Sequence, residues 1–189
     1  MAANPTTAPG VKLEVWEQNL ADLIDDYVSN YKGSTGASPM PSAFSPSLGP
    51  YFVLKGRQYG VDPSLVLGIC RSESSMGTAP HVNGGIFNIY GNSAHFSHRP
   101  GNPKKLNHKL YDNYLDPTED AFITLANYLA GGLKSTLAIY KKYEGESSYL
   151  NNVPLILSVQ ARLHGNPEDV TYACDAKRKD ALEQAAKKL

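Results

Sequence analysis

One carboxylate stands apart from the other acidic residues in the middle of the chain. Glu73 lies in the segment RSESSMG, after the apolar stretch YGVDPSLVLGIC, and the nearest acids are Asp62 before it and Asp112 after it. On a helix, Glu73 would share the face of Ile69 and Cys70, four and three positions earlier. Burial there raises the pKa of a carboxyl, because it disfavours the charged form. A carboxyl that keeps its proton near neutral pH is what a general acid needs, and glycoside cleavage is the reaction most often served in this way.

The ordinary alternative is a helix-terminal glutamate that points into water, since glutamate is rarely buried. A carboxylate is poorly placed at the C-terminal end of a helix, however, because the helix dipole is negative there. On these local features alone, the two interpretations of Glu73 are evenly balanced.

The helix that would carry Glu73 has clear boundaries in the sequence. Asp62 is a good N-cap and Pro63 suits the first helical position. We expect this helix to run to about Ser74 and to end near Gly77. A short helix over 51–59, ended by Gly60, is expected to precede it.

The first 50 residues divide into two parts. Residues 11–31 repeat apolar side chains at three- and four-residue steps, which predicts an amphipathic helix. Residues 33–50 are rich in Gly, Ser and Pro and have no period, so they predict a linker or a long surface loop. The N-terminal helix is therefore either an appendage or a packed arm.

The composition changes again after the helix of Glu73. Residues 78–113 hold many Gly, Asn, Pro and His and predict a loop with a short hairpin. No Asp or Glu occurs between Ser74 and Tyr111, so this lobe is basic although the whole chain has 18 basic and 18 acidic residues. The basic residues of the lobe are Arg99, Lys104, Lys105 and Lys109.

Helical pattern returns with DPTEDAFITLANYLAGG. Asp116 is expected to cap this helix, with Pro117 in its first turn and Glu119 at the capping-box position. Further helices fit the ranges 133–143, 153–164 and 174–188. The predicted fold class is mostly α, with one irregular or β-hairpin lobe inserted after the helix of Glu73.

Composition and cysteine usage exclude several classes of function. The net charge is zero, so nothing global points to nucleic acid or a membrane surface. The apolar runs are too short to cross a bilayer, and MAANPTTAPG lacks the features of a secretory signal. Cys70 is most simply a small buried thiol, and the alternative, a disulfide with Cys174, needs an oxidising compartment. His95 and His98 lack a third ligand at matching spacing, so no metal site is predicted.

Four segments, in this order, resemble one known family. Residues 59–77, YGVDPSLVLGICRSESSMG, resemble the catalytic helix of the lysozyme-like superfamily, including lytic transglycosylases. Their ESSMG fits the E-S-x-x-G of the bacterial glucosaminidase family of peptidoglycan hydrolases, which is mannosyl-glycoprotein endo-beta-N-acetylglucosaminidase-like. GGIFNIYG at 84–91 is similar to that family's N-N-L-F-G-I-x-G, and KLYDNY precedes a helix as its Phe-x-x-Tyr strand does. YACD at 172–175 resembles its Y-A-T-D.

The resemblance covers residues 51–188 and implies a lysozyme-like α+β domain, with a substrate groove between a helical lobe and a small β or loop lobe. The expected organisation is an N-terminal arm at 1–32, a linker or loop at 33–50 and the catalytic domain at 51–189. By position, Glu73 would be the catalytic acid and Tyr172 would face the sugar beside the cut. The other residues assigned to substrate binding are Ser74, Phe87, Tyr90, Tyr111 and Tyr114.

One departure from the family bears on mechanism. The family often places a second acid in the lobe before the Phe-x-x-Tyr strand, and here Asp112 is the first candidate, within the strand pattern itself. An inverting hydrolase needs a base carboxylate roughly 6.5–9.5 Å from the acid. A substrate-assisted hydrolase or a lytic transglycosylase needs Glu73 alone, and the missing acid favours these two.

The resemblance implies a peptidoglycan hydrolase, an N-acetylglucosaminidase that cuts β-1,4 bonds of the glycan strand. The alternatives are a lytic transglycosylase that forms 1,6-anhydro ends and a glycan-binding module without turnover. The basic lobe would suit the lactyl or peptide carboxylates of peptidoglycan, or is simply a solvated loop. No cofactor is needed, a monomer is assumed, and the expected location is extracytoplasmic or secreted, at the cell wall, in a bacterium or as a phage lysin.

Overall fold

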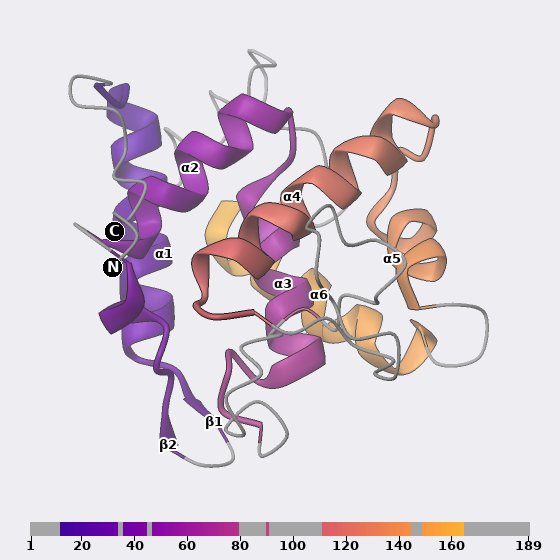
Figure 1. The fold of residues 1–189 in the computed structure, drawn as a ribbon. Coiled ribbons are helices and arrows are strands. Elements are labelled where there is room, and N and C mark those ends of the chain that lie inside the picture. The colour runs from indigo at the N-terminus through magenta and orange to yellow at the C-terminus, as the bar shows by residue number, and fades with distance from the viewer. Residues whose placement is uncertain are drawn as a thin grey trace.

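The computed structural model describes residues 12–33, 36–44, 47–79, 90, 111–144 and 149–164. This part is mostly helical, as the sequence predicts, with one small antiparallel sheet (Figure 1). The sheet lies at residues 32–33 and 36–37, in the segment predicted as arm and linker, whereas most of the lobe expected to hold a hairpin, 78–113, lies outside the described residues. The elements are α1 (Val15–Ser29), β1 (Lys32–Gly33), β2 (Gly36–Ala37), η1 (Pro41–Ala43), α2 (Leu48–Tyr59), α3 (Pro63–Ser74), α4 (Leu115–Ala130), α5 (Thr136–Glu144) and α6 (Tyr149–His164). Among these helices, none combines the length and apolarity needed to cross a bilayer.

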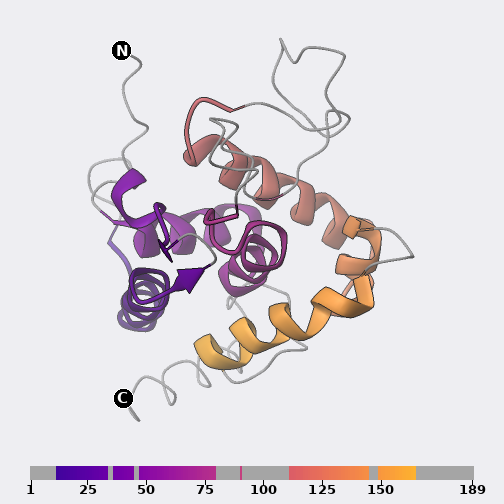
Figure 2. The same ribbon diagram turned by 90° about the horizontal axis from the view of Figure 1, so that it is seen from below.

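Helix α3 lies at the centre of the other helices. Figure 2 shows it nearly end-on, with α4 and α6 on opposite sides and α1 flanking it. Every residue from Pro63 to Cys70 is buried, as expected for a helix that is enclosed on all sides. The predicted N-cap is confirmed, because the Asp62 carboxylate accepts a hydrogen bond of 2.9 Å from the backbone N–H of Ser64.

Close packing and a buried polar chain fix α3 against α6 and α5. At Gly68, a Cβ atom would lie 3.0 Å from Ile156 Cα, so only glycine permits this approach. The Gln160 amide donates to Asp62 over 3.5 Å and accepts a 2.7 Å hydrogen bond from the Thr136 hydroxyl. These contacts set the rotation of α3 and place its C-terminal end beside α5.

Helix α1 is a packed arm, which decides between the two alternatives left by the sequence. A Cβ at Gly49 would lie 2.0 Å from the carbonyl oxygen of Ala21, so α1 and α2 are in backbone contact. The Gly49 N–H donates to Asp25 over 2.7 Å, and a salt bridge joins Arg57 of α2 to the buried Glu17. The helix predicted over 11–31 is thereby confirmed, within slightly narrower bounds.

Part of the segment predicted as linker or surface loop is instead packed into the core. Met40 is 0% exposed and Phe44 is 4% exposed, on either side of η1. Phe44 packs edge-on against Tyr51, with ring centroids 5.2 Å apart. Two apolar side chains four positions apart anchor a Pro- and Ser-rich turn whose own residues are not buried. Helix α2 begins at Leu48, before the expected position 51.

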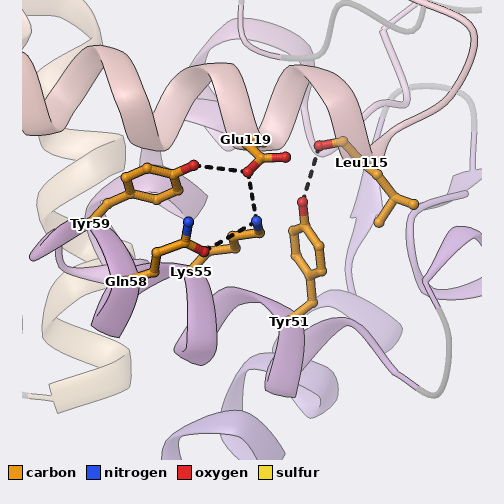
Figure 3. A network of polar contacts seen from close by, with 6 residues as sticks. All are labelled: Tyr51, Lys55, Gln58, Tyr59, Leu115 and Glu119. Atoms are coloured by element: carbon orange, nitrogen blue, oxygen red, sulfur yellow. Dashed lines mark hydrogen bonds and ion pairs between the residues drawn. The ribbon is translucent and has the colours of Figure 1, made fainter. Parts of the chain in front are cut away.

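The start of α4 also differs from the prediction. Asp116 does not cap the helix; its backbone N–H donates to the Asn113 side chain over 3.0 Å. Glu119 does not complete a capping box but accepts hydrogen bonds from Lys55 and Tyr59 of α2, at 2.6 and 2.8 Å (Figure 3). Asn113 thus accepts the hydrogen bond at the start of α4, and the ion pair between Lys55 and Glu119 ties α4 to α2.

The remaining predicted elements have mixed outcomes. The helices expected over 133–143 and 153–164 are confirmed as α5 and α6, with α6 starting earlier. Most of the lobe over 78–113 and the helix over 174–188 lie outside the described residues. The lysozyme-like arrangement itself stays a prediction.

We predict that Met40→Ala lowers the free energy of unfolding by about 2–5 kcal/mol, because it opens a cavity in the core beside the Cys70 thiol. Urea denaturation followed by circular dichroism measures the change. The matched control is Ser42→Ala, an exposed position two residues later, which should stay within about 0.5 kcal/mol of the wild type. Equal effects at the two positions would mean that the segment is the surface loop suggested by its composition.

Candidate active site

Glu73 lies in the last turn of α3, immediately before a tight left-handed turn. Ser75, Met76 and Gly77 have φ angles of 49°, 55° and 77°. Non-glycine residues rarely adopt this conformation, so the surrounding contacts must hold it. The Met76 carbonyl accepts a 2.7 Å hydrogen bond from Ser38, and the Ser74 hydroxyl accepts one of 3.0 Å from the Gly77 N–H. The end of α3 is therefore fixed by contacts on both sides of the turn.

The Glu73 side chain is half-buried and meets side chains of α5. The Tyr140 hydroxyl donates to Glu73 Oε1 over 2.8 Å. The same hydroxyl lies 3.1 Å from Glu144 Oε1 and 3.0 Å from the hydroxyl of Ser72. One phenol hydroxyl thus joins two carboxyl groups that come from the C-terminal ends of two helices.

Burial and the second carboxyl both keep the proton on Glu73. Desolvation is the largest cause and the Glu144 carboxyl is the next, and together they raise the pKa of Glu73 to about 9. The hydrogen bond from Tyr140 lowers this pKa, but less than the other causes raise it. Glu73 therefore carries its proton at neutral pH, as the apolar face of the helix predicts.

The tyrosine and cysteine side chains near Glu73 are neutral. Burial raises the pKa of Tyr140 and of Tyr143, and the negative charge of Glu73 raises both further. Burial also raises the pKa of the Cys70 thiol to about 12. Cys70 is a free and fully buried cysteine, so the predicted small buried thiol is confirmed and a nucleophilic role is unsuitable.

Three of the residues assigned to substrate binding have internal partners instead of exposed faces. Ser74 is 1% exposed and its hydroxyl donates to the Cys70 carbonyl over 2.9 Å. Tyr90 is fully buried, and its hydroxyl accepts a 3.2 Å hydrogen bond from Thr118. The buried Tyr111 donates to Asp120 over 2.9 Å. In this conformation these side chains stabilise the domain and none of the three offers a ring or hydroxyl to a surface ligand.

Of the remaining assigned residues, two lie within the described part of the chain and two lie outside it. Tyr114 is half-buried where α4 begins, and Asp112 is exposed just before it. Phe87 and Tyr172 lie outside the described residues. The carboxyl that shares a hydroxyl with Glu73 and raises its pKa is Glu144, and a role for Asp112 as second acid stays a prediction.

Sequence reasoning missed Glu144 because no motif marks it. It ends a helix that was predicted only from its period, and 67 positions separate Tyr140 from Glu73 along the chain. One signal was present: Tyr140 and Glu144 are four positions apart, and residues at this spacing share a helix face.

The arrangement is suited to proton transfer. It combines a neutral carboxyl, a hydroxyl and a second carboxyl in one hydrogen-bonded group, which is the equipment of a general acid. Among the described residues, no cluster of three metal-binding side chains occurs, and His95 and His98 lie outside that part.

No known protein family, curated protein or solved structure matches this chain.

We predict that Glu73→Gln raises the melting temperature by an amount that grows with pH. A folded-state pKa of about 9, against 4.5 for an ordinary glutamate, means that Glu73 contributes stability below about pH 4.5 and loses it as the pH rises towards 9. Glutamine does not titrate, so it keeps this contribution. Melting curves should be recorded from about pH 5 to about pH 9. The melting temperature of Glu73→Gln should exceed that of the wild type by a difference that increases to several degrees at the upper end.

The control is Asp22→Asn, on the exposed face of α1, whose difference from the wild type should not vary in this way. A constant difference between Glu73→Gln and the wild type across the range would show that the Glu73 carboxyl titrates normally.

Proposed function

We propose that this protein cleaves the glycan strands of peptidoglycan as an N-acetylglucosaminidase, with Glu73 as the general acid. The observation that supports this most directly is a carboxyl whose pKa of about 9 keeps it protonated at neutral pH, at the end of a central buried helix. The four segments that resemble the bacterial glucosaminidase family supply the substrate class.

A glycosidic bond requires such a group because the departing sugar oxygen is a poor leaving group until it receives a proton. Glu73 donates its proton to that oxygen as the bond to the anomeric carbon breaks. A buried carboxyl with a raised pKa is present in its acid form at the working pH, which is the condition for general acid catalysis.

The proposed mechanism uses Glu73 twice. In the substrate-assisted route, the N-acetyl carbonyl oxygen of the sugar attacks the anomeric carbon while Glu73 protonates the leaving oxygen. The Glu73 carboxylate then takes a proton from water, whose oxygen attacks the same carbon and restores the N-acetyl group. This route needs no carboxylate on the opposite side of the sugar.

A lytic transglycosylase is the second candidate, and the same observation favours it. The C6 hydroxyl of the sugar replaces water as the attacking group, and the Glu73 carboxylate takes the proton from that hydroxyl. The product is a 1,6-anhydro ring. A glycan-binding module is the candidate from another class, and it needs none of the proton chemistry at Glu73.

We predict that the wild type releases soluble fragments from purified peptidoglycan and that Glu73→Gln lowers the rate by at least about a hundredfold, the range lost with a general acid. Mass spectrometry of the fragments separates the candidates, because hydrolysis leaves reducing ends whereas a transglycosylase leaves fragments lighter by one water. A sedimentation assay with insoluble peptidoglycan should show that Glu73→Gln still binds.

Asp22→Asn is the control, since it removes an exposed carboxylate of α1 that has no assigned role in catalysis. Binding without fragments from the wild type would leave the glycan-binding module. Equal fragment release by the wild type and Glu73→Gln would remove Glu73 from the mechanism.

A further inference from the structure

We propose that Glu144 is a positioning residue that holds the reactive proton on Glu73, through the hydroxyl of Tyr140 that both carboxyl groups contact. This inference deepens the proposed function and rests on it. It assigns a role to a carboxyl that no motif in the chain marks.

The first support is a count of protons in the hydrogen-bonded group. Tyr140 has one hydroxyl proton, yet its oxygen lies within 3.1 Å of Glu73, Glu144 and Ser72 oxygens. The Ser72 hydroxyl has its own acceptor, the Ile69 carbonyl, at 3.1 Å. If both carboxyls were ionised, Tyr140 would donate to one of them and present its lone pairs to the other. A proton on one carboxyl removes this conflict.

The second support is the direction of the electrostatic field at the two carboxyls. Glu73 is near the C-terminal end of α3 and Glu144 ends α5, so both lie where the helix dipole disfavours negative charge. The state in which one of the two carboxyls is ionised is therefore more favourable than the state in which both are ionised. The nearest cation on α3, Arg71, donates instead to Tyr27 of α1 and Ser158 of α6.

The charged and titratable groups around Glu73 and Glu144 come from several described elements. Two exposed cations, Lys141 and Lys142, are in the last turn of α5 beside Glu144. Helix α5 contributes Glu144, Tyr140 and Tyr143, and α3 contributes Cys70. Tyr111, just before α4, and Tyr128, within α4, also raise the pKa of Tyr143. The tyrosines and the cysteine with raised pKa values stay neutral in the working range, so Glu144 is the group whose charge can control Glu73.

The geometry excludes Glu144 as the water-activating base of an inverting enzyme. Glu73 Oε1 and Glu144 Oε1 contact the same hydroxyl, at 2.8 and 3.1 Å. These oxygens are therefore closer together than the roughly 6.5–9.5 Å between the acid and base of an inverting enzyme.

Glu73 and Glu144 end each catalytic cycle in the protonation states in which they began it. Glu73 gives its proton to the leaving oxygen and becomes a carboxylate next to Glu144. Two adjacent negative charges make the Glu73 carboxylate a stronger base, so it takes a proton back from the attacking water or C6 hydroxyl. Glu144 and Tyr140 begin and end the cycle with the protons they started with.

The test compares Glu144→Gln and Tyr140→Phe, because the two changes shift Glu73 in opposite directions. Loss of the Glu144 charge should lower the pKa of Glu73 by about one unit or more, and loss of the Tyr140 donor should raise it. Carbon-13 NMR of the glutamate side-chain carboxyls measures both titrations, with the Glu73 resonance assigned by its loss in Glu73→Gln.

The basic limb of the pH profile for peptidoglycan cleavage should move with the titration, to lower pH in Glu144→Gln and to higher pH in Tyr140→Phe. Glu144→Asp keeps the charge and should restore part of the wild-type midpoint, while Asp22→Asn should leave it unchanged. A merely structural role for Glu144 would lower activity without moving the midpoint or the limb.

The two proposals fail in distinguishable ways. If the wild type does not cleave peptidoglycan, the proposed function fails, and the NMR titration still decides whether Glu144 controls the Glu73 proton. A Glu73 midpoint unchanged in Glu144→Gln would overturn the inference. If Glu144→Gln does not fold, the titration of Glu73 in Tyr140→Phe tests the inference instead. A Glu73 midpoint unchanged in Tyr140→Phe would show that the shared hydroxyl does not influence the proton on Glu73, and it would overturn the inference.

Discussion

The enclosure of α3 by other helices is the constraint on which the rest of the structure depends. A helix buried on every side cannot turn about its axis, and contacts at its start, middle and end hold this one. Asp62 caps its first turn and joins Gln160, Gly68 permits the approach of α6, and Ser74 fixes the turn that follows. The direction in which Glu73 points is thereby decided by packing along the whole helix.

This enclosure also carries a cost at the site. A left-handed turn with two non-glycine residues and two carboxyls at helix C-termini are each unfavourable taken alone. Proteins retain such features where the surrounding packing holds them in place, and they gather at functional sites. Here burial and the neighbouring Glu144 carboxyl keep a proton on Glu73, and the left-handed turn follows directly after it.

The sequence predicted those features that depend on neighbouring residues. The Asp62–Pro63 start of α3 and the period of α1 are local patterns, and both are confirmed. The position of Glu73 relative to Ile69 and Cys70 on one helix face made its burial one of two balanced alternatives. These predictions needed no knowledge of which elements meet.

Features that depend on distant contacts could not be predicted in this way. Met40 lies in a Pro- and Ser-rich segment, and its burial depends on core side chains from distant parts of the chain, including Cys70. Glu119 has the spacing of a capping box, yet Lys55 competes for it more strongly. A motif likewise gives the position of Tyr90 but not the direction of its side chain, and the pairing of Glu144 with Glu73 arises from the packing of α5.

The most direct test of the central claim is the infrared difference spectrum between the wild type and Glu73→Gln at neutral pH. The account predicts that the wild type has an additional carbonyl-stretch band of a protonated carboxyl group, and that this band disappears as the pH rises through about 9. A difference spectrum at neutral pH that contains only carboxylate bands would show that Glu73 is ionised, and it would contradict its role as a resident general acid.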